Sequence, residues 1–102
     1  MNKDALTAKL LDLAEGRETP ETWWSWWDEH EMELETLLGR GEFLKLKPRR
    51  HGFQWVPVFG SQKGAIAILE KSGTAFEASN LYQERYLAEL DAFCEEQKQV
   101  QR

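Results

Sequence analysis

The segment from Thr19 to Gly39 constrains the fold of this chain more than any other part of the sequence. Thr19 followed by Pro20 is a strong helix start, because threonine can cap a first turn and proline there loses no needed hydrogen bond. At about 100° per residue, one arc of about 160° holds all the tryptophans and leucines that follow. These are Trp23, Trp24, Trp26, Trp27, Leu34, Leu37 and Leu38. The segment therefore predicts an amphipathic helix with a broad buried aromatic face, ended by Gly39 and Gly41.

Helical spacing predicts two more helices, one near each end of the chain. Asn2 or Asp4 can cap the first, Gly16 is a natural stop, and three leucines form one stripe: Leu6, Leu10 and Leu13. Ser79 or Asn80 can cap the last, which should run to about Gln97. Its apolar arc contains Tyr82, Tyr86, Leu87, Leu90, Phe93 and Cys94. We expect this arc to be buried in the core, with Cys94 as a structural cysteine.

The middle of the chain predicts strands. Leu44 and Leu46 alternate with lysines, which is typical of a strand. The run FQWVPVF at 53–59 is aromatic and β-branched, and Pro57 makes it an edge strand or an irregular extended segment. With PRRHG as the loop, we expect an antiparallel hairpin of residues 43–47 and 53–58. The next segment, 61–72, fits either a helix capped by Ser61 or a pair of strands, and we favour the helix.

These elements predict an α+β fold of three to four amphipathic helices packed with a small antiparallel β-hairpin. A length of 102 residues suits one globular domain over 1–102, with a polar, frayed tail at 98–102. The single cysteine suits a reducing compartment. The N-terminal segment has no long apolar run, so we expect neither a signal peptide nor a membrane span. We therefore expect a cytoplasmic protein with no membrane partner.

Charge is distributed unevenly along the chain. The segment 39–63 carries six bases and one acid, whereas the remainder carries seven bases and 17 acids, which gives the net charge of −5. Such a molecule can dock to a partner of mixed charge, or it can pair its own basic loop with its own acidic helices. Both interpretations remain open from the sequence.

Residues that could carry catalysis or bind a metal are few. His30 falls in the centre of the Trp/Leu face, where it is either a neutral core histidine or a general base in an aromatic pocket with Trp23 and Trp27. The sequence around it lacks the second histidine of a zinc helix and the glutamate of a di-iron helix. We therefore expect no catalytic residue, metal or cofactor. A small enzyme or a ligand-binding protein that uses His30 remains an alternative.

The function that we favour from the sequence is that of a small, acidic protein-binding module. Trp24 and Trp26 fall at the two edges of the apolar arc, where an interface would begin, and Met32 falls on the acidic back. Close acids on one helix repel each other, and a basic partner would relieve that repulsion. The predicted contact set is Trp24, Trp26, Asp28, Glu29, Glu33 and Glu35. An immunity-type inhibitor, which occupies the basic substrate site of a toxin, is one form of such a module.

A second candidate surface is the basic and aromatic stretch 45–55. Its residues are Lys45, Lys47, Arg49, Arg50, Phe53 and Trp55. Bases interleaved with aromatic rings are what single-stranded nucleic acid requires, so a nucleic-acid-associated regulator is the alternative function. The net negative charge of the chain argues against it, since proteins that bind nucleic acids are usually basic. The oligomeric state is left open.

Overall fold

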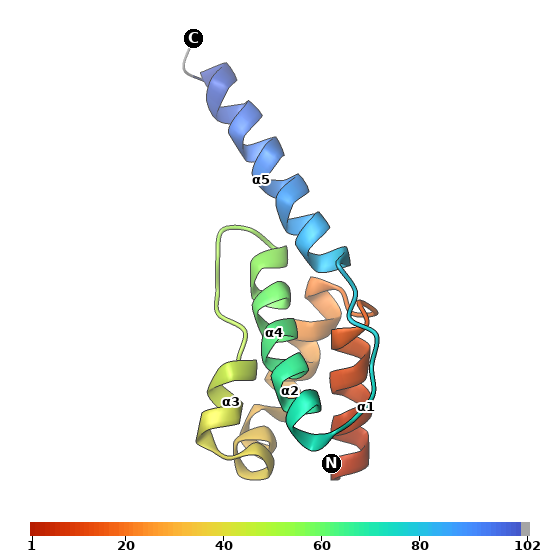
Figure 1. Cartoon of the computed structure of the whole chain (residues 1–102). Coiled ribbons are helices and arrows are strands. Elements are labelled where there is room, and N and C mark those ends of the chain that lie inside the picture. Colours follow the sequence, from red (N-terminus) through yellow and green to blue (C-terminus); the bar gives the residue numbers. More distant parts are fainter. Residues whose placement is uncertain (101–102) are drawn as a thin grey trace.

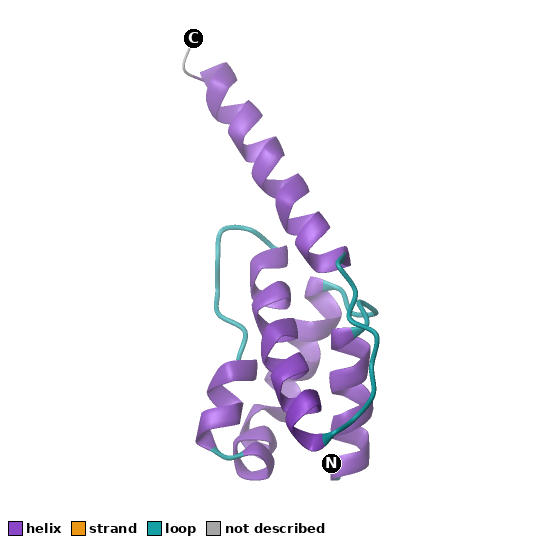
Figure 2. Ribbon diagram, viewed as in Figure 1, coloured by secondary structure: helices purple, strands orange, loops and turns teal. Residues whose placement is uncertain are grey.

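The structure, a computed structural model, describes the backbone of residues 1–100 and the side chains of residues 1–97. This part of the chain is all-helical and contains no strand, so the predicted α+β class is wrong (Figures 1 and 2). The helices are α1 (Lys3–Ala14), α2 (Pro20–Leu38), α3 (Arg40–Leu46), α4 (Trp55–Ser72) and α5 (Leu81–Val100). The side chains of the predicted frayed tail, 98–102, lie outside the described part.

The helix boundaries that were read from capping residues are largely confirmed. The side-chain oxygen of Asn2 accepts a hydrogen bond from the N–H of Ala5 at 2.8 Å and caps α1. The hydroxyl of Thr19 accepts one from the N–H of Thr22 at 3.2 Å, and Pro20 opens α2. Helix α4 ends at Gly73, whose φ of 73° lies in the left-handed region that glycine adopts without strain.

Helix α4 lies at the centre of the fold and packs against the other four helices (Figure 1). It brings Val58, Ala65 and Leu69 into the core. Its buried polar residue Gln62 donates hydrogen bonds to the carbonyl of Ala14 at 2.8 Å and to that of Ser79 at 3.0 Å. These bonds join the end of α1 to the segment that precedes α5, so the polar atoms inside the core also fix the chain path.

The aromatic face of α2 is buried as predicted. Trp23, Trp27 and Leu34 are inaccessible to solvent, and Leu37 is half-buried. The indole N–H of Trp23 donates a hydrogen bond to the hydroxyl of Ser61 on α4 at 3.0 Å. Burial of a large aromatic side chain with its one polar atom satisfied stabilises the packing of α2 on α4.

Most of the first predicted strand, 43–47, belongs to the short helix α3, which ends at Leu46. Its buried residues are Phe43 and Leu46, which are three apart and lie on one helical face. Leu44, which the strand pattern placed with Leu46, is exposed. The alternation of leucine and lysine was therefore misleading, because the pair that enters the core has a helical spacing.

The second predicted strand, 53–58, falls mostly within α4, which begins at Trp55. Pro57 is the third residue of this helix, where the backbone N–H has no intrahelical partner, so proline costs no hydrogen bond. The predicted helix at 61–72 is confirmed as the rest of α4, but Ser61 does not cap it. Ser61 is instead buried in the middle of the helix, where it accepts the indole bond described above.

Helix α5 is anchored at its base and then leaves the body of the protein (Figure 1). Tyr82 is fully buried, stacks on Trp55 with 5.6 Å between the ring centroids, and accepts a hydrogen bond from the N–H of Glu18 at 2.8 Å. Beyond it the expected burial fails. Tyr86 and Leu90 are only half-buried, and Cys94 is exposed. The predicted helix is confirmed, but the predicted burial of its apolar arc holds fully only for Tyr82.

The buried phenol of Tyr82 predicts a loss of stability in alkali. Burial raises the pKa of Tyr82 from 10.0 to about 12. Between these pH values the unfolded chain releases the phenolic proton while the folded chain keeps it, so the free energy of unfolding falls as pH rises. We expect thermal denaturation curves of the wild type to move to lower temperature over this range.

The matched variants are Tyr82→Phe and Tyr86→Phe. Tyr82→Phe should lose about 1–3 kcal/mol at neutral pH, because the N–H of Glu18 is left without its acceptor. Above pH 10, however, its stability should decline less steeply than that of the wild type. Tyr86→Phe should keep the wild-type slope. Equal alkaline slopes for the wild type and Tyr82→Phe would show that Tyr82 does not hold its proton as described.

Candidate functional site

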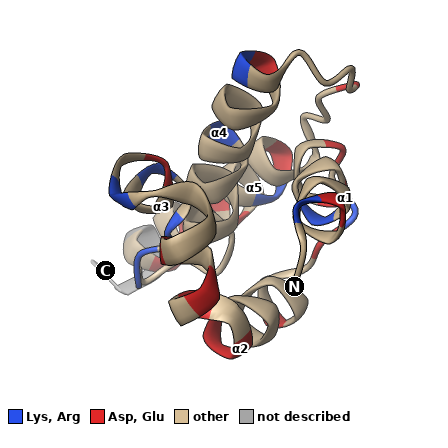
Figure 3. Cartoon of the chain, turned by 90° about the horizontal axis from the view of Figure 1, so that it is seen from below, with Lys and Arg blue, Asp and Glu red and all other residues tan. Residues whose placement is uncertain are grey.

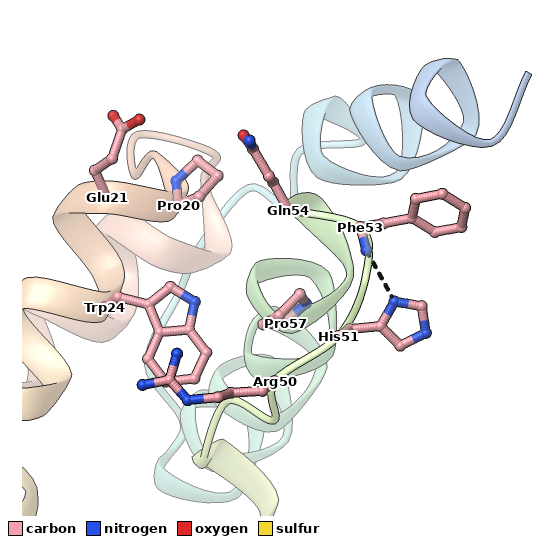
Figure 4. A pocket seen from close by; sticks show the side chains of 8 residues that line it. All are labelled: Pro20, Glu21, Trp24, Arg50, His51, Phe53, Gln54 and Pro57. Carbon is pink, nitrogen blue, oxygen red and sulfur yellow. Dashed lines mark hydrogen bonds between the residues drawn. The ribbon is translucent and has the colours of Figure 1, made fainter. Parts of the chain in front are cut away.

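A cleft lies between α2 and the loop 47–54. It has a volume of about 470 Å³ (Figure 4). The residues that line it are Pro20, Glu21, Trp24, Arg50, His51, Phe53, Gln54 and Pro57. The guanidinium of Arg50 lies over the ring of Trp24, 5.0 Å from its centroid. The acidic helix and the basic loop, which the sequence presented as rival surfaces, therefore meet at Trp24.

The loop 47–54 is held against the body at both ends. At its start, the ammonium of Lys47 lies 3.3 Å from the carboxylate of Glu31 on α2. At its end, Glu89 of α5 accepts hydrogen bonds from the N–H groups of Gln54 at 2.9 Å and Trp55 at 2.7 Å. A carboxylate at this position accepts hydrogen bonds from N–H groups at the start of α4 that have no partner within the helix. Its negative charge also interacts favourably with the positive end of the helix dipole. Glu89 thus replaces the local cap that α4 lacks, and no local sequence pattern indicates this role.

The predicted acidic contact set is divided between the two edges of α2. Trp24 and Asp28 lie on the edge beside the loop, where both line one hollow with Lys47 and Arg50. Trp26 lies on the other edge, beside α1, and the ammonium of Lys9 lies 5.4 Å from its ring centroid. The two edge tryptophans are therefore separated by the outward face of the helix.

Glu33 lies on the same edge of α2 as Trp26 and is paired within the chain. The N-terminal ammonium donates a hydrogen bond to its carboxylate at 3.0 Å. That bond and the positive charge hold the pKa of Glu33 below its ordinary value. Glu33 is therefore less free to bind a partner than the sequence indicates.

The outward face of α2 carries acids that lack such partners. Met32 is 88% exposed and has Asp28, Glu29 and Glu35 within one helical turn of it. Within the described residues, no ion pair involves these three carboxylates or that of Glu21. Figure 3 shows the acidic side of α2 and the bases near α3. We call Met32 with Asp28, Glu29 and Glu35 the acidic face.

The basic alternative set is only partly brought together. Its four bases, Lys45, Lys47, Arg49 and Arg50, line one hollow of about 570 Å³, whereas its two aromatic residues do not line it. Lys45 is exposed on α3, and Arg49 is exposed in the loop. Phe53 is half-buried, with its ring centroid 6.0 Å from that of Tyr86. Trp55 stacks on Tyr82 and so helps to hold the base of α5 on the body. The aromatic rings of this stretch are thus used mainly in internal packing.

His30 lies beside Trp26, with 5.0 Å between the ring centroids, in a hollow between α1 and α2. Its Nδ1 atom is buried, has no hydrogen-bond partner in the described part of the chain, and lies 3.6 Å from a carboxylate oxygen of Glu33. Trp23 and Trp27 are inaccessible, so Trp26 is the tryptophan that lines the hollow with His30. No group of three or more potential metal ligands occurs among the described residues.

Comparison of the chain with models of protein families, with curated proteins and with solved structures finds no match. In the part of the chain that the structure describes, no helix combines the length and the apolar character needed to cross a membrane.

Proposed function

We propose that the protein is a small, cytoplasmic protein-binding module that takes a basic partner on the acidic face of α2. The observation that carries this proposal is the exposure of Met32 among carboxylates without ion pairs in the described part of the chain. An exposed large apolar side chain can gain by burial in a complex. The carboxylates around Met32 favour a partner whose binding surface is basic.

Electrostatics supports both the affinity and the speed of this interaction. The acids repel one another across the outward face of α2, and a basic surface relieves that repulsion. The net charge of −5 attracts a basic protein over distances comparable to the Debye length, so association should be fast and sensitive to salt. An immunity-type inhibitor of a toxin with a basic substrate site is the form of this function that we favour.

The edge tryptophan Trp24 extends the same surface toward the loop. It is half-buried, and the side chain that covers it, Arg50, is exposed. A basic partner that contacts Asp28 can therefore reach Trp24 by displacing one side chain. Nucleic-acid binding by the loop has less support, because Lys47 and Arg50 already contact Glu31 and Trp24 of α2.

The charge-reversal variant Glu29→Lys with Glu35→Lys is expected to lower capture of the partner about tenfold or more, since it changes the acidic face by four charges. Immobilised protein would be incubated with extract of the cells that produce it, and captured proteins would be quantified by mass spectrometry. The partner is the basic protein whose capture this variant lowers.

Two controls make that experiment specific. Glu70→Lys with Glu77→Lys alters two other exposed acids and gives the same net charge, so its capture should stay close to that of the wild type. Arg49→Glu with Arg50→Glu alters the loop and should leave capture largely intact. If only the arginine variant abolishes capture, the loop is the functional surface and the proposal is wrong.

A further inference from the structure

We propose that two copies of this chain pair through the projecting part of α5, with the two helices antiparallel. This inference concerns assembly and does not depend on the partner of α2. It starts from the burial of the apolar arc of α5. The arc has the pattern of a buried face, whereas the body buries only Tyr82 fully and leaves Leu87, Phe93 and Cys94 exposed. Leu87 and Phe93 are each 45% exposed.

A stripe of α5 that is exposed except for the half-buried Leu90 has the spacing of a coiled-coil seam. Its residues, Gln83, Leu87, Leu90, Cys94 and Gln97, follow one another at alternating intervals of four and three residues. The stripe reads the same in both directions in chemical terms, with glutamine at each end and apolar residues between. When two copies are antiparallel, Leu90 meets Leu90 of the second copy, and Leu87 faces Cys94. Such self-complementarity is what a two-fold symmetric interface requires.

Aromatic side chains beside the seam add to the same contact. Tyr86 and Phe93 flank it on the side of the body, with centroids 6.0 and 5.6 Å from that of Phe53. In the antiparallel pair, Tyr86 of one copy is level with Phe93 of the other. The apolar surface that the pair covers is therefore continuous from the seam to the loop 47–54.

Charge complementarity indicates that a second copy of the chain packs on α5, and that the two helices run in opposite directions. The far end of α5 carries Asp91, Glu95 and Glu96, with no base between 91 and 97. The loop 47–54 contacts α5 through Phe53 and carries three bases and no acid. Lys47 and Arg50 contact α2, whereas Arg49 is exposed and forms no ion pair within the described residues. Antiparallel helices bring the acidic end of each copy toward the basic loop of the other, whereas parallel helices bring like charges together. The chain thus supplies both halves of a complementary surface.

Sedimentation equilibrium over a dilution series tests the pairing. The wild type should have twice the mass of one chain at high concentration and dissociate on dilution. Leu87→Glu with Cys94→Glu places four carboxylates in the seam of the pair and should leave single chains throughout. Both positions are exposed, so circular dichroism and thermal melting should show an intact fold. The matched control, Ala88→Glu with Ala92→Glu, changes exposed residues on the opposite side of α5 and should keep the dimer.

Oxidative cross-linking tests the direction. In Leu87→Cys, the new thiol faces Cys94 of the second copy, so mild oxidation should give a covalent dimer on a non-reducing gel. The wild type should give little, because its two Cys94 residues lie on opposite sides of the two-fold axis. A wild type that is monomeric at every concentration would overturn the pairing and leave α5 to a different partner. Efficient cross-linking of Cys94 to Cys94 in a wild-type dimer would overturn the antiparallel arrangement.

Discussion

Trp27→Ala is expected to lower the free energy of unfolding by about 3–5 kcal/mol, the range for removal of a fully buried tryptophan. Trp27 is 1% exposed, and its ring centroid lies 6.0 Å from that of Trp23 and 5.3 Å from that of Phe43. It therefore joins α2 to α3 inside the core, and a cavity at this position would loosen both helices. Denaturant unfolding followed by circular dichroism measures the change.

The control for Trp27→Ala is Met32→Ala on the same helix. Met32 is almost fully exposed, so truncation removes little buried surface and should change stability by no more than about 0.5 kcal/mol. If the two variants unfold at the same denaturant concentration, the aromatic face of α2 is not the core of the protein.

Gly64→Ala is expected to cost at least about 3 kcal/mol, the upper part of the range for overpacked cores. A Cβ atom at Gly64 would lie 2.6 Å from the carbonyl carbon of Lys45 and 3.0 Å from the Cα atom of Leu46. These are backbone atoms of α3, so no side chain can rotate to make room. Helices α3 and α4 would have to separate, and the core contact of Leu46 would be lost with them.

Gly60 lies one turn earlier on α4 and provides the comparison. Beyond its chain neighbours and the backbone of its own helix, nothing lies within 4 Å of the position of its Cβ, and the residue is exposed. Gly60→Ala should therefore stabilise the protein by about 0.5–1 kcal/mol, because alanine loses less conformational entropy in a helix. Equal effects of the two substitutions would contradict the close packing of α3 on α4.

Much of the helical structure could be predicted from local chemistry. The caps at Asn2 and Thr19, the stop at Gly73 and the buried face around Trp23 and Trp27 all depend on residues close in sequence. The hairpin was predicted wrongly because short apolar runs fit either period. In 43–46 the deciding fact is that Phe43 and Leu46 both enter the core, Phe43 against Trp27 of α2 and Leu46 beside Gly64 of α4, and this fact depends on tertiary packing.

The extent of burial could not be predicted where it depends on distant parts of the chain. The arc of α5 has a clear pattern, but its coverage depends on where α4 and the loop end, so Cys94 was expected inside and lies outside. In the candidate site, the sequence indicates the acids of α2 and the exposed Met32. It does not indicate that Arg50 covers Trp24, or that Glu89 caps α4 from 34 residues away.

Hydrogen exchange of the purified complex, compared with the free protein, tests the proposed function most directly. Once a partner has been captured, backbone amides should be protected along α2 between residues 28 and 36, and the association rate should fall steeply as salt is raised. Amides of the loop 47–54 should change little. Protection confined to that loop, with an association rate that does not depend on salt, would contradict binding through the acidic face.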